Sequence, residues 1–280
     1  MEFDVRAARP DDIPLIVPWT TDTFSWGDYV PDRLPGWLAD ENSQVTVCVI
    51  GDVPVAVSHA VMLSRTEAWL EAARVHPDHK RSGMGTAMNH AGVTWAAGRG
   101  AQVVRLATEA DNGPAVHQVR ALGYRHTSTW AHSKIATGSV RSPAGTKPLS
   151  PSSLQDVDAA WMSWSHSDLS RAGRALLANG WQWRRARPDD LSRAAGRGEM
   201  FQSANGWVVV DRPEDDWFRV IWMATDATSA PAFLDEIVAL AKSAGVDEVS
   251  VKMPALGWAE EALVRTGAEP KEIYLFSLGV

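Results

Sequence analysis

The first half of the chain alternates short apolar runs with segments whose apolar residues recur every three or four positions. Period-two alternation over a short run predicts a strand, and spacings of three and four predict an amphipathic helix, as at Met88, Ala91, Gly92 and Trp95. The predicted strands lie near residues 2–8, 44–50, 53–63, 67–75, 102–107 and 124–133. The predicted helices lie near residues 10–19, 33–40, 84–98 and 114–122. We therefore expect a mixed α/β sheet.

The second half repeats this order of elements. Its predicted strands lie near residues 181–186, 199–203, 206–211, 217–224, 247–252 and 273–278, and its helices near 188–196, 230–244 and 258–266. Residues 6–13 read RAARPDDI and residues 184–191 read RRARPDDL. Proline in the first turn and aspartates at the positive end both favour a helix start, so chance similarity is an alternative. The matching order of elements favours two related domains.

A segment rich in proline, glycine and serine separates the two halves. Residues 137–153 read TGSVRSPAGTKPLSPSS, a composition typical of a linker. We expect one domain over residues 1–138, a linker over 139–153 and a second domain over 154–280. Residues 154–179 are predicted to be helical and to pack on the second domain.

Composition limits the classes of function. The chain has 280 residues, 45% of them hydrophobic, and a formal net charge of −7, which argues against nucleic-acid or anionic membrane partners. Cys48 is the only cysteine, and the eight histidines include no HExxH spacing, so we expect neither a disulfide nor a metal site. There is no signal-like start and no run of eighteen apolar residues, which predicts a cytoplasmic protein. Most of the fourteen tryptophans are expected in cores or interfaces.

One stretch carries most of the chemical information. Residues 69–85 read WLEAARVHPDHKRSGMG, an apolar strand with one glutamate that ends in a basic, glycine-containing loop before the helix 84–98. The first N–H groups of a helix have no partners and carry partial positive charge, so such a loop favours an anion, most often a phosphate. A Walker loop is excluded because Thr86 and Ala87 follow Gly85, and the third glycine of a dinucleotide-binding loop is missing.

The stretch resembles the signature of the GNAT superfamily of N-acetyltransferases. The family pattern, V-x-P followed by Arg or Gln, two residues, Gly, one residue and Gly or Ala, is matched by Val75, Pro77 and residues 80–85. A second family motif is matched by Asn112, Ala115 and the Leu-Gly-Tyr sequence of residues 122–124. The resemblance covers residues 1–133 well and extends weakly over 180–280. It implies two tandem domains, each a twisted, mostly antiparallel sheet flanked by helices.

The resemblance also implies acetyl-CoA as co-substrate, with no metal. The implied binding residues are Ala73, Val75, Lys80, Arg81, Ser82, Gly83, Met84, Gly85, Thr86, Asn112 and Ala115. The loop amides would hold the pyrophosphate, and the amides near Ala73 and Val75 would face the pantetheine. Lys80 replaces the usual Arg or Gln, which keeps the charge but loses bidentate geometry. Asn112 has the alternative role of a plain N-cap.

Glu71 is the candidate general base. An alkylammonium has a pKa of around 10, so an amine must lose a proton before it attacks a thioester at neutral pH. Period-two alternation puts Trp69, Glu71, Ala73 and Val75 on one face of the strand. The alternative for Glu71 is a surface carboxylate, or one paired with an arginine such as Arg74 or Arg105.

The general acid has several candidates, because Val119 occupies the position where most family members have a tyrosine. Tyr124 is our candidate, with His117 and Tyr29 as alternatives, and departure of the thiolate without a dedicated acid is another. Cys48 is expected to be a small core residue, which favours direct transfer over an acyl-cysteine intermediate.

The stretch TFSWGDYVPDRLPGWL resembles the acceptor-binding arm of family members that act on small molecules or amino acids. There Trp26, Asp28 and Tyr29 are the substrate candidates, with a packed helix-helix loop as the alternative.

These features predict an N-acetyltransferase that moves an acetyl group from acetyl-CoA to a primary amine of a small molecule or amino acid. The alternatives are a non-catalytic acyl-CoA sensor or adaptor, and an acetyltransferase acting on a protein amine. In the second half, MATDATSAPAFLDEI stands where the first half has its basic loop, so that half is expected not to bind CoA. We expect a monomer or a homodimer.

Overall fold

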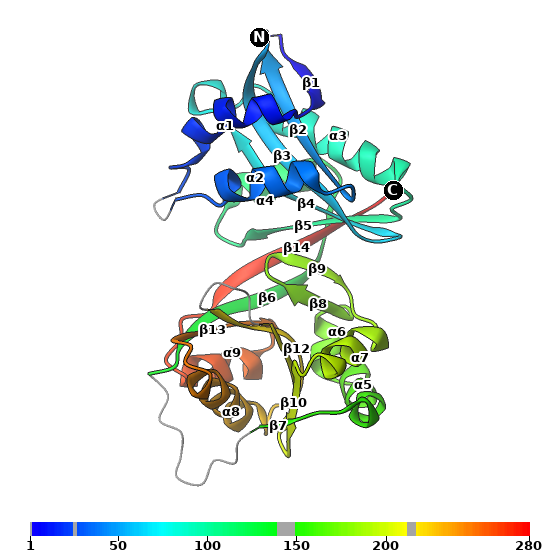
Figure 1. The fold of residues 1–280 in the computed structure, drawn as a ribbon, viewed down its shortest axis with the longest axis vertical. Helices are drawn as coiled ribbons and strands as arrows, with labels where there is room; N and C mark the ends of the chain where they lie inside the picture. The colour runs from blue at the N-terminus through cyan, green and yellow to red at the C-terminus, as the bar shows by residue number, and fades with distance from the viewer. Residues whose placement is uncertain (1, 25–26, 139–148, 212–216) are drawn as a thin grey trace. The chain divides into compact units, whose positions relative to one another are not determined.

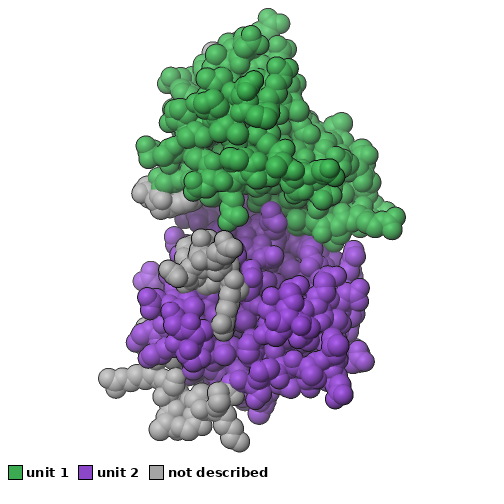
Figure 2. All heavy atoms as spheres, viewed as in Figure 1, with its two compact units in different colours: residues 1–106, 117–125, 276–280 green, residues 107–116, 126–275 purple. Residues whose placement is uncertain are grey.

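The computed structural model describes residues 2–24, 27–138, 149–211 and 217–280 (Figure 1). The chain divides into two compact units (Figure 2). Unit 1 contains Met1–Leu106, His117–Arg125 and Phe276–Val280, and unit 2 contains Ala107–Val116 and His126–Leu275. No helix within the described ranges is long and apolar enough to cross a membrane.

Unit 1 is built on a sheet in which four antiparallel strands are followed by a parallel one. Its strands are β1 (Asp4–Ala7), β2 (Ser43–Ile50), β3 (Val53–Ser64), β4 (Glu67–Val75) and the start of β5 (Val103–Glu109), in that spatial order. Its helices are α1 (Ile13–Thr20), α2 (Val30–Ala39), α3 (Met84–Gly98) and part of α4 (Gly113–Ala121). β4 and β5 are parallel because α3 carries the chain back between them.

Helices cover both faces of this sheet. Ile16 of α1 and Leu34 of α2 pack with Val47 of β2 on one face. Met88 of α3 packs with Cys48 of β2 on the other face. Val47 and Cys48 are neighbours in one strand, so their side chains point to opposite faces, and the strand is buried on both sides.

Unit 2 is built on sheet strands of mixed parallel and antiparallel pairing. Its spatial order is β14 (Lys271–Gly279), β6 (Arg125–Ala136), β13 (Glu248–Pro254), β12 (Trp217–Ala224), β11 (Gly206–Asp211), β10 (Met200–Ser203) and β7 (Ser150–Pro151). The helices are α5 (Val157–Ser165), α6 (Asp168–Ala172), α7 (Pro188–Gly196), α8 (Ala230–Ser243) and α9 (Gly257–Arg265). β12 and β13 are parallel, joined through α8, as β4 and β5 are joined through α3.

The two faces of this sheet are also covered by different helices. Val208 of β11 packs with Phe233 of α8 and Leu263 of α9. Val209, the next residue, packs with Leu191 of α7 and residues of α5. Several of the tryptophans beyond residue 150 are buried, as predicted; Trp164, Trp183 and Trp222 are examples, whereas Trp181 is exposed.

The units differ from the two halves of the sequence in their last strands. β6, the last strand of the first half, pairs antiparallel with β13 of the second half, as at Ala131 and Met253. The final residues of β14 belong to unit 1, where the Val280 amide donates to the Gln102 carbonyl at 3.1 Å. Only residues 149–153 of the predicted linker are described, and the division into tandem domains at 139–153 stays a prediction.

The elements agree closely with the sequence pattern except over residues 154–179. That segment contains α5 and α6, but its last residues form a strand, β8 (Leu176–Asn179), paired with β9 (Gln182–Arg185). The prediction of a helix there was wrong. Arg174 and Ala175 have positive φ and stop the helix, and Gly180, with φ of 58°, begins a two-residue hairpin turn after Asn179.

The repeated RPDD sequence has the same local structure in both copies. The Arg6 guanidinium donates two hydrogen bonds to the Asp12 carboxylate at 2.7 and 2.8 Å. The Arg184 guanidinium donates two to Asp190 at 2.9 and 2.8 Å. In each copy the same carboxylate also accepts the backbone N–H of the residue before the proline. The aspartate therefore caps the helix start and anchors the preceding strand.

A β-bulge in β4 changes which side chains share a face. His59 lies opposite Glu71, but Val57 lies opposite Arg74, so β4 has one extra residue between these pairs. Ala72 takes a positive φ of 58° there and packs with the α1–α2 core. Val75 packs with the α3 core instead. The prediction that strict alternation puts Val75 on the face of Glu71 was wrong, because the bulge interrupts the alternation.

The bulge generates a stability prediction. Ala72→Val should lower the free energy of unfolding by about 2–3 kcal/mol, because a β-branched residue at positive φ is strained and the site is buried. Ala73→Val is the matched control, because Ala73 is exposed on the same strand, and its effect should stay within about 0.5 kcal/mol. Urea unfolding measures both. Equal losses would contradict the bulge.

Candidate functional site

The ladder between β4 and β5 ends early and leaves the second half of β4 open along one edge. Glu67–Trp69 pair with Val103–Arg105, and no later residue of these two fully described strands is paired with the other. The edge of β4 from Leu70 to Val75 that faced β5 therefore has backbone groups available to a ligand. This open edge includes Ala73 and Val75, whose amides the resemblance places against the pantetheine.

Glu71 lies at the start of this open edge in a specific polar environment. The Nδ1 of His59, across the ladder on β3, lies 3.0 Å from one carboxylate oxygen of Glu71. The Nε1 of Trp69 donates to the other at 3.2 Å. The Glu71 side chain is 13% exposed. Glu71 is paired with neither Arg74 nor Arg105, which bind Asp28 and Glu67 instead.

Sequence reasoning missed His59, which is held in place from several sides. The ring is 2% exposed and stacks on Trp37 of α2, with centroids 4.2 Å apart and planes 9° apart. Its Nε2 is buried and has no hydrogen-bond partner among the described residues. With Nδ1 protonated the ring donates to Glu71. A lone histidine in the mostly apolar predicted strand 53–63 was the available signal. Only the register between β3 and β4 pairs it with Glu71.

Asp28 and Tyr29 surround Arg74, two residues beyond the bulge. The Arg74 guanidinium donates to both Asp28 oxygens, at 2.7 and 3.2 Å, and the Asp28 side chain has no exposed surface. The guanidinium also lies over the rings of Phe24 and Tyr29. The Asp28 carboxylate is therefore occupied by an arginine of the same chain, and a direct contact with a substrate ammonium stays a prediction. Trp26 lies outside the described residues.

The loop before α3 has the backbone of an anion-binding site. Arg81 has a φ of 63° and Gly83 a φ of 86°, and the Ser82 hydroxyl donates to the His79 carbonyl at 2.6 Å. Lys80, Arg81 and Gly83 are exposed. A Cβ added to Gly83 would meet nothing within 4 Å. None of the hydrogen bonds found within the described ranges is donated by the amides from residue 81 to 86, so these N–H groups are available at the positive end of α3.

The corresponding helix start in unit 2 is closed. The Asp226 carboxylate accepts the backbone N–H groups of Thr228 and Ser229, both at 2.9 Å, just before α8. An aspartate in this place satisfies the amides that a phosphate would need and adds a repelling negative charge. The structure thus gives a physical reason to expect no CoA site in the second half.

The two tyrosine candidates for the general acid have raised pKa values. Burial raises the pKa of Tyr124 to about 12 against a smaller opposing effect of Asn89, whose side chain lies 3.3 Å from its hydroxyl. Burial, reinforced by the Glu71 carboxylate, raises the pKa of Tyr29 to about 12. Both phenols stay protonated at neutral pH. Val119 is buried and His117 is exposed. Burial also raises the pKa of Cys48 to about 11, as expected of a core thiol.

Asn112 and Ala115 belong to unit 2, at the start of α4. The Asn112 side chain accepts the Ala115 amide at 3.3 Å, which is the geometry of an N-cap. Its role toward the cofactor stays a prediction, as do the roles of Ala73, Val75 and Met84 to Thr86.

Comparisons with known proteins bear on the first half of the chain. Residues 14–124 match the model of the Acetyltransferase (GNAT) family, and this match spans less than half of the chain. A search of curated protein sequences gives no match.

Solved structures share the fold over the whole chain. A GCN5-related N-acetyltransferase from Sphaerobacter thermophilus is 15% identical, with 99% of this chain and 95% of that chain covered at a TM-score of 0.67. A candidate acetyltransferase from Thermoplasma acidophilum is 16% identical, and the match covers 100% of both chains with a TM-score of 0.62. A fungal multi-domain β-N-acetylglucosaminidase contains a GCN5-related glucosamine N-acetyltransferase region and is 12% identical. The match covers 99% of this chain and 38% of that chain, with a TM-score of 0.66. At these identities the likeness establishes the fold.

The Asp28–Arg74 pair generates a pH prediction. Burial opposes ionisation of Asp28, but the hydrogen bonds and charge of Arg74 outweigh it, so the pKa of this carboxyl lies below its ordinary value. Its stabilising effect is therefore complete above the unfolded pKa of about 3.9 and is lost as the pH falls through the folded value.

Asp28→Asn should lower the free energy of unfolding by about 3 kcal/mol at pH 7, because it leaves the Arg74 charge without its partner. The difference from the wild type should shrink below pH 4, as measured by denaturant unfolding from pH 7 to pH 3. Asp32→Asn, on the exposed surface of α2, is the control and should cost less than about 1 kcal/mol. A pH-independent difference would rule out the ion pair as its cause.

Proposed function

We propose that this protein transfers an acetyl group from acetyl-CoA to a primary amine of a small molecule or amino acid by direct attack. The observation that carries the proposal is the open loop from Lys80 to Gly85 at the start of α3, at the end of a splayed strand that also holds Glu71. A phosphate-binding helix start, a free strand edge and a carboxylate are the three parts that this reaction requires.

The residues of the loop fit a pyrophosphate group. The amides of residues 81–86 would donate to it, and the exposed Lys80 and Arg81 would add positive charge. The open space beside Gly83 would let the backbone approach the phosphate closely. The β4 edge near Ala73 and Val75 would hold the pantetheine arm. When bound, acetyl-CoA supplies the activated acyl group.

Glu71 would receive the proton of the acceptor amine. One of its oxygens faces His59 and the other accepts from Trp69, so the orientation of the carboxylate is fixed. His59 would act as a positioning residue that holds the carboxylate toward the amine. Tyr124 or Tyr29 would protonate the leaving thiolate if a dedicated acid acts, although a pKa of about 12 makes each a weak acid for this step.

Two other functions share parts of this site. A non-catalytic acyl-CoA sensor would need the loop but not Glu71, and an enzyme acting on a protein amine would need a wider acceptor opening. The aromatic side chains on this face of β4 favour a small acceptor, because Phe24 and Tyr29 lie against Arg74 and Trp37 contacts both Tyr29 and His59. We propose that the second half is a degenerate copy of the first that binds no CoA, and that the protein is a monomer or homodimer in the cytoplasm.

Acetyl-CoA is expected to bind once per chain, and Gly83→Val should abolish this binding by adding a side chain where the backbone must approach phosphate. Gly245→Val is the matched control: Gly245 also has a positive φ and open space, but it lies after α8 in unit 2. Both variants carry similar backbone strain, and only the first should lose binding in calorimetry. Two equivalent sites per chain would contradict the proposal.

Glu71→Gln is expected to lower turnover at neutral pH by about 10²–10⁴-fold, with little change in acetyl-CoA affinity, because it removes a base and not a cofactor contact. Glu41→Gln, in an exposed turn, is the control. Turnover rates of the wild type and both variants are compared from pH 6 to 9 by detection of the free thiol. A variant with wild-type rates throughout would place the base elsewhere.

The acceptor can be identified by incubating the protein and acetyl-CoA with a panel of amino acids, polyamines and amino sugars. Release of the free thiol of CoA is measured for each amine. Glucosamine belongs in the panel because one structural relative is named for its acetylation. Release of thiol with at least one small amine supports the proposal. Acetyl-CoA binding without release for any amine, peptide amines included, would favour the sensor.

A further inference from the structure

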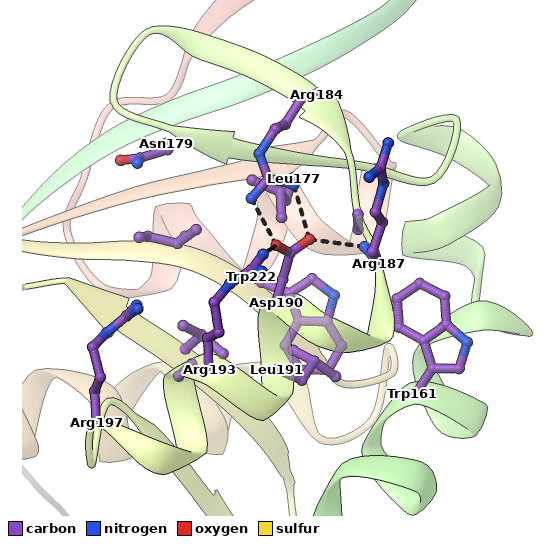
Figure 3. Close-up of a pocket in the computed structure, with 14 residues that line it drawn as sticks. Trp161, Leu177, Asn179, Arg184, Arg187, Asp190, Leu191, Arg193, Arg197 and Trp222 are labelled. Atoms are coloured by element: carbon purple, nitrogen blue, oxygen red, sulfur yellow. Dashed lines mark hydrogen bonds and ion pairs between the residues drawn. The ribbon is translucent and has the colours of Figure 1, made fainter. Parts of the chain in front are cut away.

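Unit 2 contains a cavity of about 210 Å³ that the proposed transfer reaction does not use (Figure 3). Residues of α5, the β8–β9 hairpin, α7, β11 and β12 line it. Its volume is far above the 10–15 Å³ or so that one water needs and below the roughly 300 Å³ at which typical drug-sized pockets begin. It therefore suits a small molecule.

Four guanidinium groups line this cavity: Arg184, Arg187, Arg193 and Arg197. Arg184 and Arg193 both donate to Asp190, so that two positive charges share one carboxylate (Figure 3). Arg197 is paired with Glu199 at 2.6 and 2.8 Å. Among the described residues, Asp190 and Glu199 are the carboxylates that these arginines contact, and neither contacts the Arg187 side chain.

Arg187 supplies the least compensated of these charges. Its backbone N–H donates to Asp190, but its side chain extends away from that carboxylate in Figure 3. Its guanidinium is exposed and has no hydrogen bond or ion pair among the described residues. A planar guanidinium without a partner at the edge of a cavity is suited to bind a carboxylate through two parallel hydrogen bonds.

The repeat in the first half shows that the fold does not need these extra arginines. Arg184, Arg187 and Asp190 correspond to Arg6, Arg9 and Asp12 in the matching sequence. The helix cap is complete in the first half, yet the positions that correspond to Arg193 and Arg197 are Leu15 and Trp19. The additional charges are therefore particular to the second half.

The rest of the lining is apolar and aromatic. Trp161, Leu191, Val209, Ile221 and Trp222 contribute to the lining. The Nε1 of Trp222 is buried without a hydrogen-bond partner among the described residues, so one donor in the lining is unsatisfied. A bare inorganic anion would satisfy the arginines but leave this apolar surface in contact with water.

We propose that this cavity binds a small organic carboxylate with an apolar, aromatic body. The carboxylate lies at the arginine rim with Arg187, and the ring lies against Trp161 and Leu191. Ten or so heavy atoms fill such a cavity, and ligands of that size bind with dissociation constants on the order of 0.1–1 mM unless every contact is optimal.

Calorimetry on the full chain tests the proposal with phenylacetate, its uncharged analogue phenylacetamide, and inorganic phosphate as probes. We expect phenylacetate to bind once per chain, and phenylacetamide and phosphate to bind at least about tenfold more weakly. Absence of phenylacetate binding up to about 10 mM would overturn the proposal. Equal binding of the amide would show that the arginines do not select a charge, and tighter binding of phosphate would show that the apolar wall is not used.

Variants locate the site. Arg187→Gln should weaken phenylacetate binding about tenfold, as expected for the loss of one charge-assisted hydrogen-bonding group. The matched control is Arg9→Gln, which removes the corresponding arginine of the first half, and it should leave the affinity unchanged. Trp161→Leu removes the aromatic wall and should also weaken binding, several-fold. Unchanged affinity in both Arg187→Gln and Trp161→Leu would place the bound probe elsewhere.

Discussion

The departure of β4 from β5 after Trp69 is the constraint on which the candidate site depends. A strand that loses its neighbour leaves an edge of unpaired backbone groups, and the bulge at Ala72 turns the following side chains. Glu71 is left facing His59, Arg74 faces Asp28, and Val75 enters the α3 core. The chain then leaves the strand with its loop amides at the start of α3. Together, the departure of β4 from β5 and the bulge at Ala72 set the directions of the Glu71 carboxylate, the Arg74 guanidinium and the loop before α3.

Much of the fold could be predicted from hydrophobic periodicity, because most strands and helices of this chain are buried on defined faces. The helix 84–98 and the loop before it have strong local signals, namely a three-and-four apolar spacing and two glycines beside basic residues. The bulge has none: Ala72 is an ordinary alanine in an apolar run, and its positive φ follows from tertiary packing. The faces of Val75 and Glu71 could not be assigned correctly for this reason.

Contacts between residues far apart in the sequence also could not be predicted from local sequence patterns. Asp28 and Arg74 are separated by 46 positions, and His59 and Glu71 by 12, so each pair depends on register and on the placement of α2. The sequence suggested Asp28 as a carboxylate for a substrate ammonium, whereas the structure gives that carboxylate to Arg74. Arg74 in turn lies over two aromatic rings, so the pair holds Phe24 and Tyr29 beside this part of β4.

The two copies of the RPDD motif allow the roles of the two halves to be separated physically. Both use an arginine–aspartate pair to join a strand to the helix that follows, which is a requirement of folding. They differ where function is expected: the start of α3 is open and basic, while the start of α8 is closed by Asp226.

The last strand adds a further constraint, because unit 1 includes Phe276–Val280 and its buried Phe276. A chain that ended at the predicted linker would lack these residues, so loss of activity on truncation would report an incomplete first unit as readily as a missing second one. Substitutions within α7 or α8 are therefore the sharper way to separate the contribution of the second half from the folding of the first.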